Sequence, residues 1–266
     1  MQKSFRHKFK NVFLFFAKNA RLLVFSSATQ IGFYKLGAYL VYGPRQLVLR
    51  ERSMEPEIIP AILVKERGEL LRRISLVKDF VKTVQIDVMD GVFVPNKTVG
   101  IEDLKGLPRT MYEFHWMVRD PINWIEQTPG NHMHLVHIET VPSFEDVKAA
   151  VKKSGGKLGL ALNPETPLEK LLPFVPEVEE VLVMTVHPGF SGQKYIPEME
   201  DKIRALRKLH PSLDIEVDGG IGPDTIGRAY AAGANLLAAA SSIFSSEDIE
   251  ENIENLRKCA LSGCPA

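Results

Sequence analysis

Three side chains that could transfer protons or bind a metal stand near the ends of apolar segments. Asp87 lies near the end of the segment 84–89, Asp218 closes the segment 213–218, and His115 lies in the segment 111–117. A carboxylate among apolar neighbours is costly unless it is paired, protonated or bound to a ligand. A lone Asp would more simply form an ion pair, and Asp90 could cap a turn. Two such acids together with a histidine instead favour a catalytic site.

The chemistry that two opposed carboxylates can perform is proton transfer on both faces of one carbon. One carboxylate removes a proton from one face, and the other returns a proton to the opposite face. Alternate residues of a strand share a face, so Gln85, Asp87 and Met89 should point together toward such a site.

The elements that would position these residues alternate between strand and helix from Ile58 onward. The patterns predict strands at 58–63, 84–89, 111–117, 132–138, 158–162, 178–186, 213–218 and 236–240. Helices are predicted at 65–80, 101–104, from Pro121, from Ser143, and at 167–172, 197–209, 223–232 and 247–259. Eight strand–helix units in this length predict an α/β fold of the (β/α)8 TIM barrel type. An open doubly wound sheet is the lower-ranked alternative, because no Gly-x-Gly-x-x-Gly follows the first strand.

Small residues follow three neighbouring strands of this predicted barrel. They are Gly189-Phe190-Ser191-Gly192, Gly219-Gly220 and Ala240-Ser241. Backbone amides in glycine-rich loops can approach an anion closely, and in barrels the loops after strands seven and eight commonly hold phosphate. Tight turns without a ligand are the simpler explanation for any one of them. Three such loops on adjacent strand ends predict a phosphate site.

From Pro60 to about Cys259 the chain resembles the ribulose-phosphate 3-epimerase family. The segments that carry the resemblance occur in family order: Pro60–Leu63, Asp87–Asn96, His115–Val118, His137–Glu139, Ala161–Pro167, Val183–Gln193, Val217–Ile221 and Ser241–Phe244. Residues 1–53 lie outside it.

The resemblance implies epimerisation of a ketopentose phosphate, D-ribulose 5-phosphate or D-xylulose 5-phosphate, with a divalent cation of the zinc, iron or manganese class. It implies that Asp87 and Asp218 are the acid/base groups. The implied metal positions are Gln85, Asp87, His115 and Asp218. The implied substrate-binding positions are Ala61, Met89, His115, Met117, Met184, Gly189, Phe190, Ser191, Gly192, Gly219, Gly220, Ala240 and Ser241. The three methionines match thioethers around the reaction intermediate, although methionine also serves as ordinary core filler.

Four positions differ from the family pattern. Gln85 stands where the family has a metal-binding histidine, and Ala61 stands where it has a substrate-contacting serine. Ser191 and Ala240 each replace a glycine. An amide oxygen is a poorer ligand than imidazole for zinc-like ions, so we expect a weakly bound metal. The alternatives are an epimerase for another ketose phosphate and a catalytically weakened barrel that binds sugar phosphates.

The first 53 residues differ in charge from the rest of the chain. They carry ten Lys and Arg and one acid, whereas the whole chain has no formal net charge. The barrel segment, 54–266, is therefore acidic, which argues against nucleic-acid binding. The basic extension could lie on an anionic membrane surface, although its apolar runs are poor membrane spans. Alternatively, translation begins at Met54.

We expect a cytoplasmic homo-oligomer, a phosphorylated small sugar as ligand, and reduced thiols at Cys259 and Cys264.

Overall fold

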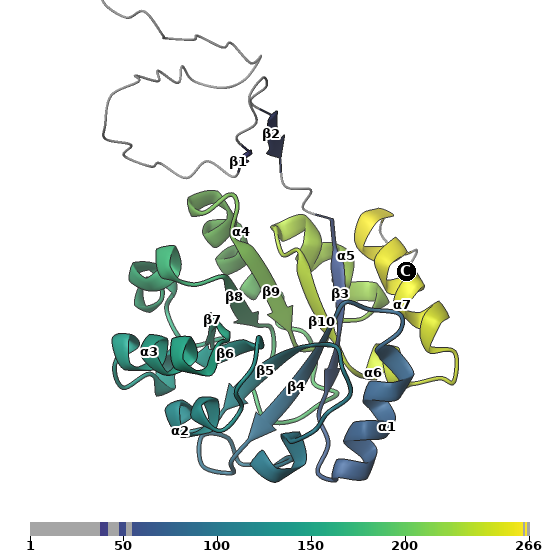
Figure 1. Ribbon diagram of the computed structural model, residues 1–266. Coiled ribbons are helices and arrows are strands. Elements are labelled where there is room, and N and C mark those ends of the chain that lie inside the picture. Colours follow the sequence, from purple (N-terminus) through teal and green to yellow (C-terminus); the bar gives the residue numbers. More distant parts are fainter. Residues whose placement is uncertain (1–37, 42–47, 52–54, 263, 265–266) are drawn as a thin grey trace, which may run out of the picture. The chain divides into compact units, whose positions relative to one another are not determined.

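Eight parallel strands form a closed barrel in the computed structural model, which describes residues 38–41, 48–51, 55–262 and 264. The strands neighbour one another in the order β10-β3-β4-β5-β6-β7-β8-β9 and back to β10 (Figure 1). Their bounds are β3 (Glu57–Ile62), β4 (Thr83–Met89), β5 (Met111–Met117), β6 (Met133–His137), β7 (Lys157–Leu162), β8 (Glu180–Met184), β9 (Asp214–Asp218) and β10 (Leu236–Ala239). The predicted (β/α)8 barrel is confirmed.

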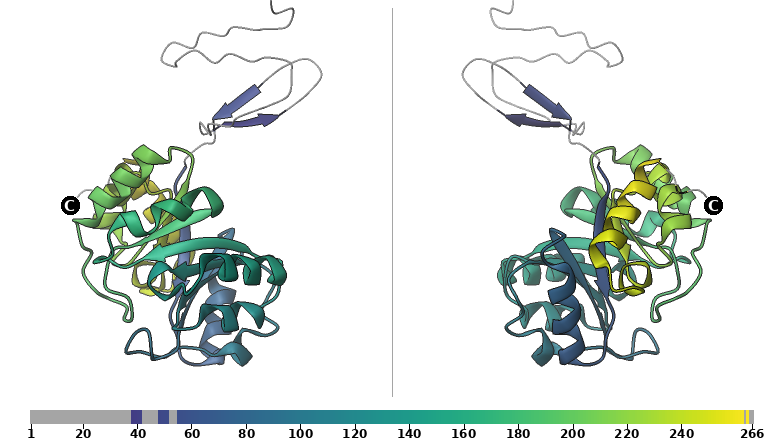
Figure 2. Two further views of the ribbon diagram at one scale, coloured as in Figure 1. Left: turned by 90° about the vertical axis from the view of Figure 1, so that its left-hand side faces the viewer. Right: turned by 90° about the vertical axis from the view of Figure 1, so that its right-hand side faces the viewer.

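Helices surround this barrel on its outer face (Figure 2). The α-helices are α1 (Arg67–Val77), α2 (Pro121–Glu126), α3 (Phe144–Ser154), α4 (Met199–Leu209), α5 (Pro223–Ala232), α6 (Ser241–Phe244) and α7 (Ile249–Ser262). The 3-10 helices are η2 (Ile101–Leu104), η3 (Ile138–Thr140), η4 (Leu168–Lys170) and η5 (Leu172–Glu177).

Two of the units depart from the predicted helices. The segment predicted as one short helix at 167–172 forms η4 and η5 instead. Pro173 and Pro176 lack the N–H groups that would continue a regular helix. The short α6 directly after β10 was not predicted. The predicted start of α3 is confirmed, because Ser143 Oγ accepts a hydrogen bond from the Asp146 N–H at 3.4 Å.

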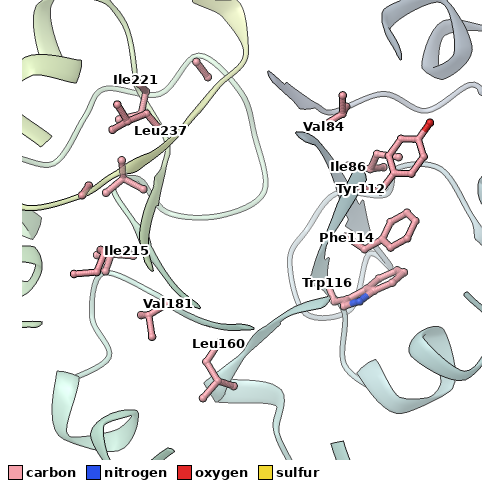
Figure 3. Close-up of a cluster of buried hydrophobic side chains, with 14 of the residues drawn as sticks. Val84, Ile86, Tyr112, Phe114, Trp116, Leu160, Val181, Ile215, Ile221 and Leu237 are labelled. Carbon is pink, nitrogen blue, oxygen red and sulfur yellow. The ribbon is translucent and has the colours of Figure 1, made fainter. Parts of the chain in front are cut away.

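The main hydrophobic core fills the space between the strands and the helices. Alternate residues of β5 supply the aromatic rings Tyr112, Phe114 and Trp116 to this layer, and all three are buried. Figure 3 shows them in a row along β5. Phe114 stacks on Trp116 with ring centroids 5.2 Å apart. The intervening residues Glu113, His115 and Met117 belong to the opposite face of the strand, which places His115 inside the barrel.

The inside of the barrel also holds three buried glutamates, Glu113, Glu180 and Glu216, whose carboxylates approach within 4.8 Å of one another. Burial, and next the charge of Asp214, raise the pKa of Glu180 to about 8. The folded state therefore holds a proton that the unfolded chain releases near the ordinary glutamate pKa. The protonated Glu180 makes its full contribution to the free energy of unfolding below pH 4.5. This contribution is lost as the pH rises toward 8.

We expect Glu180→Gln to reduce the decrease in unfolding free energy that occurs as the pH rises. The amide stays neutral, so the variant should exceed the parent protein by more than ~1 kcal/mol in unfolding free energy at pH 8. Denaturant unfolding from pH 5 to 8.5 measures the effect. Exposed Glu179→Gln is the matched control on the same segment. Parallel pH profiles for parent and Glu180→Gln would show that Glu180 is ionised throughout this range.

Two further strands lie in the N-terminal region, where the sequence pattern predicted none before Ile58. β1 (Ala38–Val41) pairs antiparallel with β2 (Val48–Glu51). Neither strand is part of the barrel sheet. The rest of the predicted extension, 1–37, 42–47 and 52–53, lies outside the described residues, and so does the predicted membrane-surface segment. Among the residues described, no helix is both long and apolar enough to cross a membrane.

We expect a chain that starts at Met54 to fold into a soluble barrel with unchanged activity. All eight barrel strands lie between Glu57 and Ala239, and the ring closes by pairing β10 with β3. Thermal unfolding and catalytic activity, measured on the truncated and full-length chains, test this. Aggregation or loss of activity in the truncated chain would show that the extension belongs to the folded domain.

The expectation of reduced thiols is wrong. Cys259, in the last turns of α7, forms a disulfide with Cys264. The Cα atoms of the two cysteines are 4.6 Å apart, which lies within the range that disulfides span. The helix ends at Ser262, and this lets the chain bring Cys264 back to Cys259.

Candidate active site

Asp87, His115 and Asp218 meet inside the barrel, at the ends of β4, β5 and β9. His115 Nδ1 lies 3.0 Å from Asp87 Oδ1 and 3.3 Å from Asp218 Oδ2. Asp87 and His115 are register partners on adjacent strands. β4 and β9 are three steps apart round the ring. The Asp87 and Asp218 side chains both point into the barrel, so they meet at His115 although their strands are not neighbours.

Gln85 joins the two aspartates. Its Nε2 donates to Asp87 Oδ1 at 2.9 Å and to Asp218 Oδ2 at 2.8 Å. The prediction that Gln85 and Asp87 share a face is thus confirmed. The amide is fully buried, and its Oε1 has no hydrogen-bond partner. A buried acceptor without a donor is unfavourable, so this oxygen is available to a ligand.

The electrostatics of the site favour a positive charge between the two aspartates, where His115 lies. Burial alone lowers the pKa of His115, but hydrogen bonds to Asp218 and Asp87 outweigh burial and raise the pKa to about 9. Burial, and next the charge of Asp218, raise the pKa of Asp87 despite its contacts with His115 and Gln85. Two acids close together cannot both ionise freely. The pair therefore attracts a cation or retains a proton.

The donor set suits a divalent cation. One ligand atom from each of Asp87, His115 and Asp218 lies within 4.8 Å of the others. Two carboxylate oxygens and an imidazole nitrogen are ligands that zinc, iron and manganese accept. Gln85 Oε1 could serve as a fourth ligand after the amide rotates, because it has no competing partner.

The loop after β4 is fastened to the end of the strand that carries Asp87. Thr98 Oγ1 donates to the Asp87 carbonyl and accepts from the Met89 N–H, both at 2.8 Å. Asp90 Oδ1 accepts from the N–H groups of Val92 and Phe93. Asp90 therefore caps a turn, which is the simpler alternative that the sequence offered for this residue. The role of Thr98 was not predicted, since it lies nine residues beyond the strand.

Sequence reasoning gave no role to His137 and Glu139, although both belong to this site. His137 Nε2 lies 2.8 Å from His115 Nε2, and His137 Nδ1 lies 3.3 Å from Glu139 Oε2. Burial, and next the charge of His115, lower the pKa of His137 to about 4, against a hydrogen bond to Glu139 that raises it. The signal that could have identified the pair is a histidine at a strand end with an acid two residues later.

Residues 57–244 match the sequence model that describes the ribulose-phosphate 3 epimerase family. The cytoplasmic isoform of ribulose-phosphate 3-epimerase from Oryza sativa is 42% identical over 215 residues, which cover 77% of this chain and 93% of that protein. Ribulose-phosphate 3-epimerase from Schizosaccharomyces pombe is 34% identical over 217 residues, 78% of this chain and 95% of that protein.

The chain belongs to the ribulose-phosphate 3-epimerase family. It is accordingly an isomerase.

Solved structures support the fold of this epimerase. KGPDC from Streptococcus mutans superposes with a TM-score of 0.62 at 11% identity, covering 76% of this chain and 96% of that one. The 3-hexulose-6-phosphate synthase from Salmonella typhimurium superposes with a TM-score of 0.59 at 15% identity, covering 78% of this chain and 100% of that one.

The three predicted methionines of this epimerase are all buried, but they lie in two clusters. Met89 and Met117 are register partners and pack with Val94. Met184 belongs to a separate cluster with Leu135, Ala161, Leu182 and Val186. Its register partner is Asp218. Met89 and Met117 therefore lie on the β4–β5 side of the barrel and Met184 on the β8–β9 side.

The small-residue loops of the epimerase family pattern are also close together. Ser242 Oγ donates to the Ile221 carbonyl at 2.8 Å, which joins α6, directly after β10, to the loop after β9. Gly220 has a φ of +66°, and a Cβ there would lie 2.6 Å from the Tyr195 backbone nitrogen. Only glycine fits this close approach. Gly189 and Gly192 also have positive φ.

The remaining predicted positions divide between the barrel interior and its mouth. Ala61 is buried on β3 and is the register partner of Gln85. Ala240 directly precedes α6, and Ser241 is the first residue of that helix. Phe190 is 54% exposed on the loop after β8, next to exposed Ser191. Asn96 Nδ2 donates to the Gly189 carbonyl at 2.8 Å, so the loops after β4 and β8 touch.

Proposed function

We propose that this protein epimerises a ketopentose phosphate, interconverting D-ribulose 5-phosphate and D-xylulose 5-phosphate by two-base proton transfer. The observation that carries the proposal is the convergence of Asp87 and Asp218 on the same two nitrogens, Gln85 Nε2 and His115 Nδ1. Both acids come from strand ends, where active sites of such barrels lie. Family membership supports the same reaction.

Inversion beside a ketone needs one base and one acid on opposite faces of the carbon. The raised pKa of Asp87 favours one proton on the carboxylate pair, which is the charge state with which such a cycle starts. One aspartate removes the C3 proton, and the other delivers its proton to the opposite face. The Gln85 side-chain N–H groups hold both carboxylates in place between turnovers.

A divalent cation would be held by Asp87, His115 and Asp218, with Gln85 as a weaker fourth ligand. When bound, it supplies Lewis-acid stabilisation of the negative charge that develops as the proton leaves. The loops Gly189–Gly192, Gly219–Gly220 and Ala240–Ser241 would bind the substrate phosphate through backbone N–H groups. Met89, Met117 and Met184 would exclude water from the reacting carbon.

A second candidate is a weakened barrel that binds sugar phosphates without turnover. It is favoured by the Gln85 amide bridging both aspartates, and by Ala61, which provides no hydroxyl next to Gln85. A related epimerase for a larger ketose phosphate is the alternative within the same chemistry. We propose a cytoplasmic location, in keeping with the name of the rice relative. We also propose that the protein is a homo-oligomer.

The test is a coupled assay of the full-length protein on D-ribulose 5-phosphate, with a ketohexose 6-phosphate for comparison. Zinc, iron(II) and manganese are each supplied in turn. We expect turnover of the pentose phosphate with at least one metal. Binding of the sugar phosphate without turnover under every metal would favour the weakened barrel instead.

A further inference from the structure

Beyond the acid pair, His115, His137 and Glu139 form a row of side chains in contact. We propose that His137 and Glu139 are positioning residues that fix which nitrogen of His115 carries its proton, so that Nδ1 is free for a divalent cation. The inference rests on the proposed metal-assisted function. It assigns roles to two side chains that act on His115 rather than on the aspartates, and that have no role in the proton-transfer scheme above.

The geometry decides which nitrogen of His115 faces which group. Nδ1 lies next to both carboxylates, at 3.0 and 3.3 Å, whereas Nε2 faces His137 at 2.8 Å. A cation bound together with Asp87 and Asp218 must therefore use Nδ1. A metal-bound neutral imidazole carries its proton on the other nitrogen. His115 Nε2–H then donates, and His137 Nε2 must accept.

Glu139 enforces the accepting form of His137. If His137 Nε2 accepts, its proton is on Nδ1, which faces Glu139 Oε2 at 3.3 Å. A carboxylate can only accept from it. His137 is fully buried and its ring is nearly parallel to that of His115, with ring centroids 5.0 Å apart and an interplanar angle of 17°. Phe93 contacts its ring from another side, with centroids 4.9 Å apart. The ring is therefore packed in place.

The other oxygen of Glu139 is already engaged. Oε1 accepts from the Asn163 N–H at 2.8 Å and from Thr166 Oγ1. An amide at position 139 would have one oxygen only, and these two donors would attract it. Its NH2 group would then face His137 Nδ1, where it requires an acceptor. Glu139→Gln should therefore move the His137 proton to Nε2, opposite the Nε2–H of His115.

Two N–H groups cannot point at each other over 2.8 Å, so His115 in that variant must shift its own proton to Nδ1. The nitrogen that would bind the cation is then blocked by a proton. Loss of such an outer partner of a metal ligand typically weakens metal affinity by ~10- to 100-fold. Because the shape of Gln matches that of Glu, this weakening would come from the proton position rather than from lost packing.

The experiment uses the full-length protein and requires no turnover. Nitrogen-15 NMR of the histidine rings, recorded without metal and with zinc, reports which ring nitrogen of His137 is protonated. Calorimetric zinc titration gives the affinity. We expect His137 Nδ1–H in the parent protein and Nε2–H in Glu139→Gln, with zinc bound ~10- to 100-fold more weakly. Glu165→Gln is the matched control, because Glu165 pairs with His187 at 2.7 Å on the surface; it should change neither readout.

A second pair of variants keeps the inference testable if Glu139→Gln does not fold. His137→Gln can still offer an oxygen to His115 Nε2–H, whereas His137→Phe cannot. We expect zinc affinity to be largely retained in the first and ~10- to 100-fold weaker in the second. An unchanged His137 tautomer in Glu139→Gln, or equal zinc affinities for the two His137 variants, would overturn the inference. Since neither readout involves substrate, an inactive parent protein would refute the proposed function without affecting this result.

Discussion

Asp87→Asn and Asp218→Asn should each lower epimerisation by at least ~10²-fold while leaving the fold intact. Asn keeps the shape of Asp but cannot accept and return a proton, so either substitution interrupts the cycle on one face of the substrate. The two aspartates come from strands three steps apart, and no other carboxylate contacts both Gln85 and His115 in the described part of the chain. The measurement is initial rate at saturating D-ribulose 5-phosphate.

Asp201→Asn is the control, because Asp201 is exposed and pairs with Arg204 on α4. It should retain the parent rate, and circular dichroism should be the same for all three variants. Near-normal turnover in either the Asp87 or the Asp218 variant would show that the acid pair does not perform the chemistry.

Gln85→His should tighten the binding of zinc by ~10- to 100-fold, on the scale of other changes around metal ligands. The Gln85 side chain already reaches both aspartates, so an imidazole at this position would lie next to Asp87, His115 and Asp218. Imidazole is a better ligand than an amide oxygen for zinc-like ions. Calorimetric titration of parent and variant measures the affinity, with turnover recorded at saturating metal.

Gln127→His, at the exposed end of α2, adds a histidine away from the barrel and should leave zinc affinity unchanged. Equal affinity in parent and Gln85→His would show that the side chain at 85 does not take part in metal binding. Tighter zinc without turnover would favour the weakened barrel, because a completed ligand set would then not restore the chemistry.

The barrel and the acid pair were predictable because their signals are local. Each strand is an apolar run, and period-two alternation places Gln85 and Asp87 on one face. The residues that depend on contacts between strands were not predictable. His137 acts through a ring on β5, and Glu139 through donors after β7. The three buried glutamates are likewise far apart in sequence, and only barrel closure brings them together. The pairing of Cys259 with Cys264 depends on where α7 ends, which the helical pattern fixes only loosely.

The most direct test of the two-aspartate account follows hydrogen at C3 during turnover in D2O. D-ribulose 5-phosphate is incubated with the full-length protein and saturating metal, and the D-xylulose 5-phosphate formed is analysed by proton NMR at early conversion. Because one aspartate removes the proton and a different one, equilibrated with solvent, supplies its replacement, the product should carry deuterium at C3. Product that retains the original hydrogen at C3 would contradict the account.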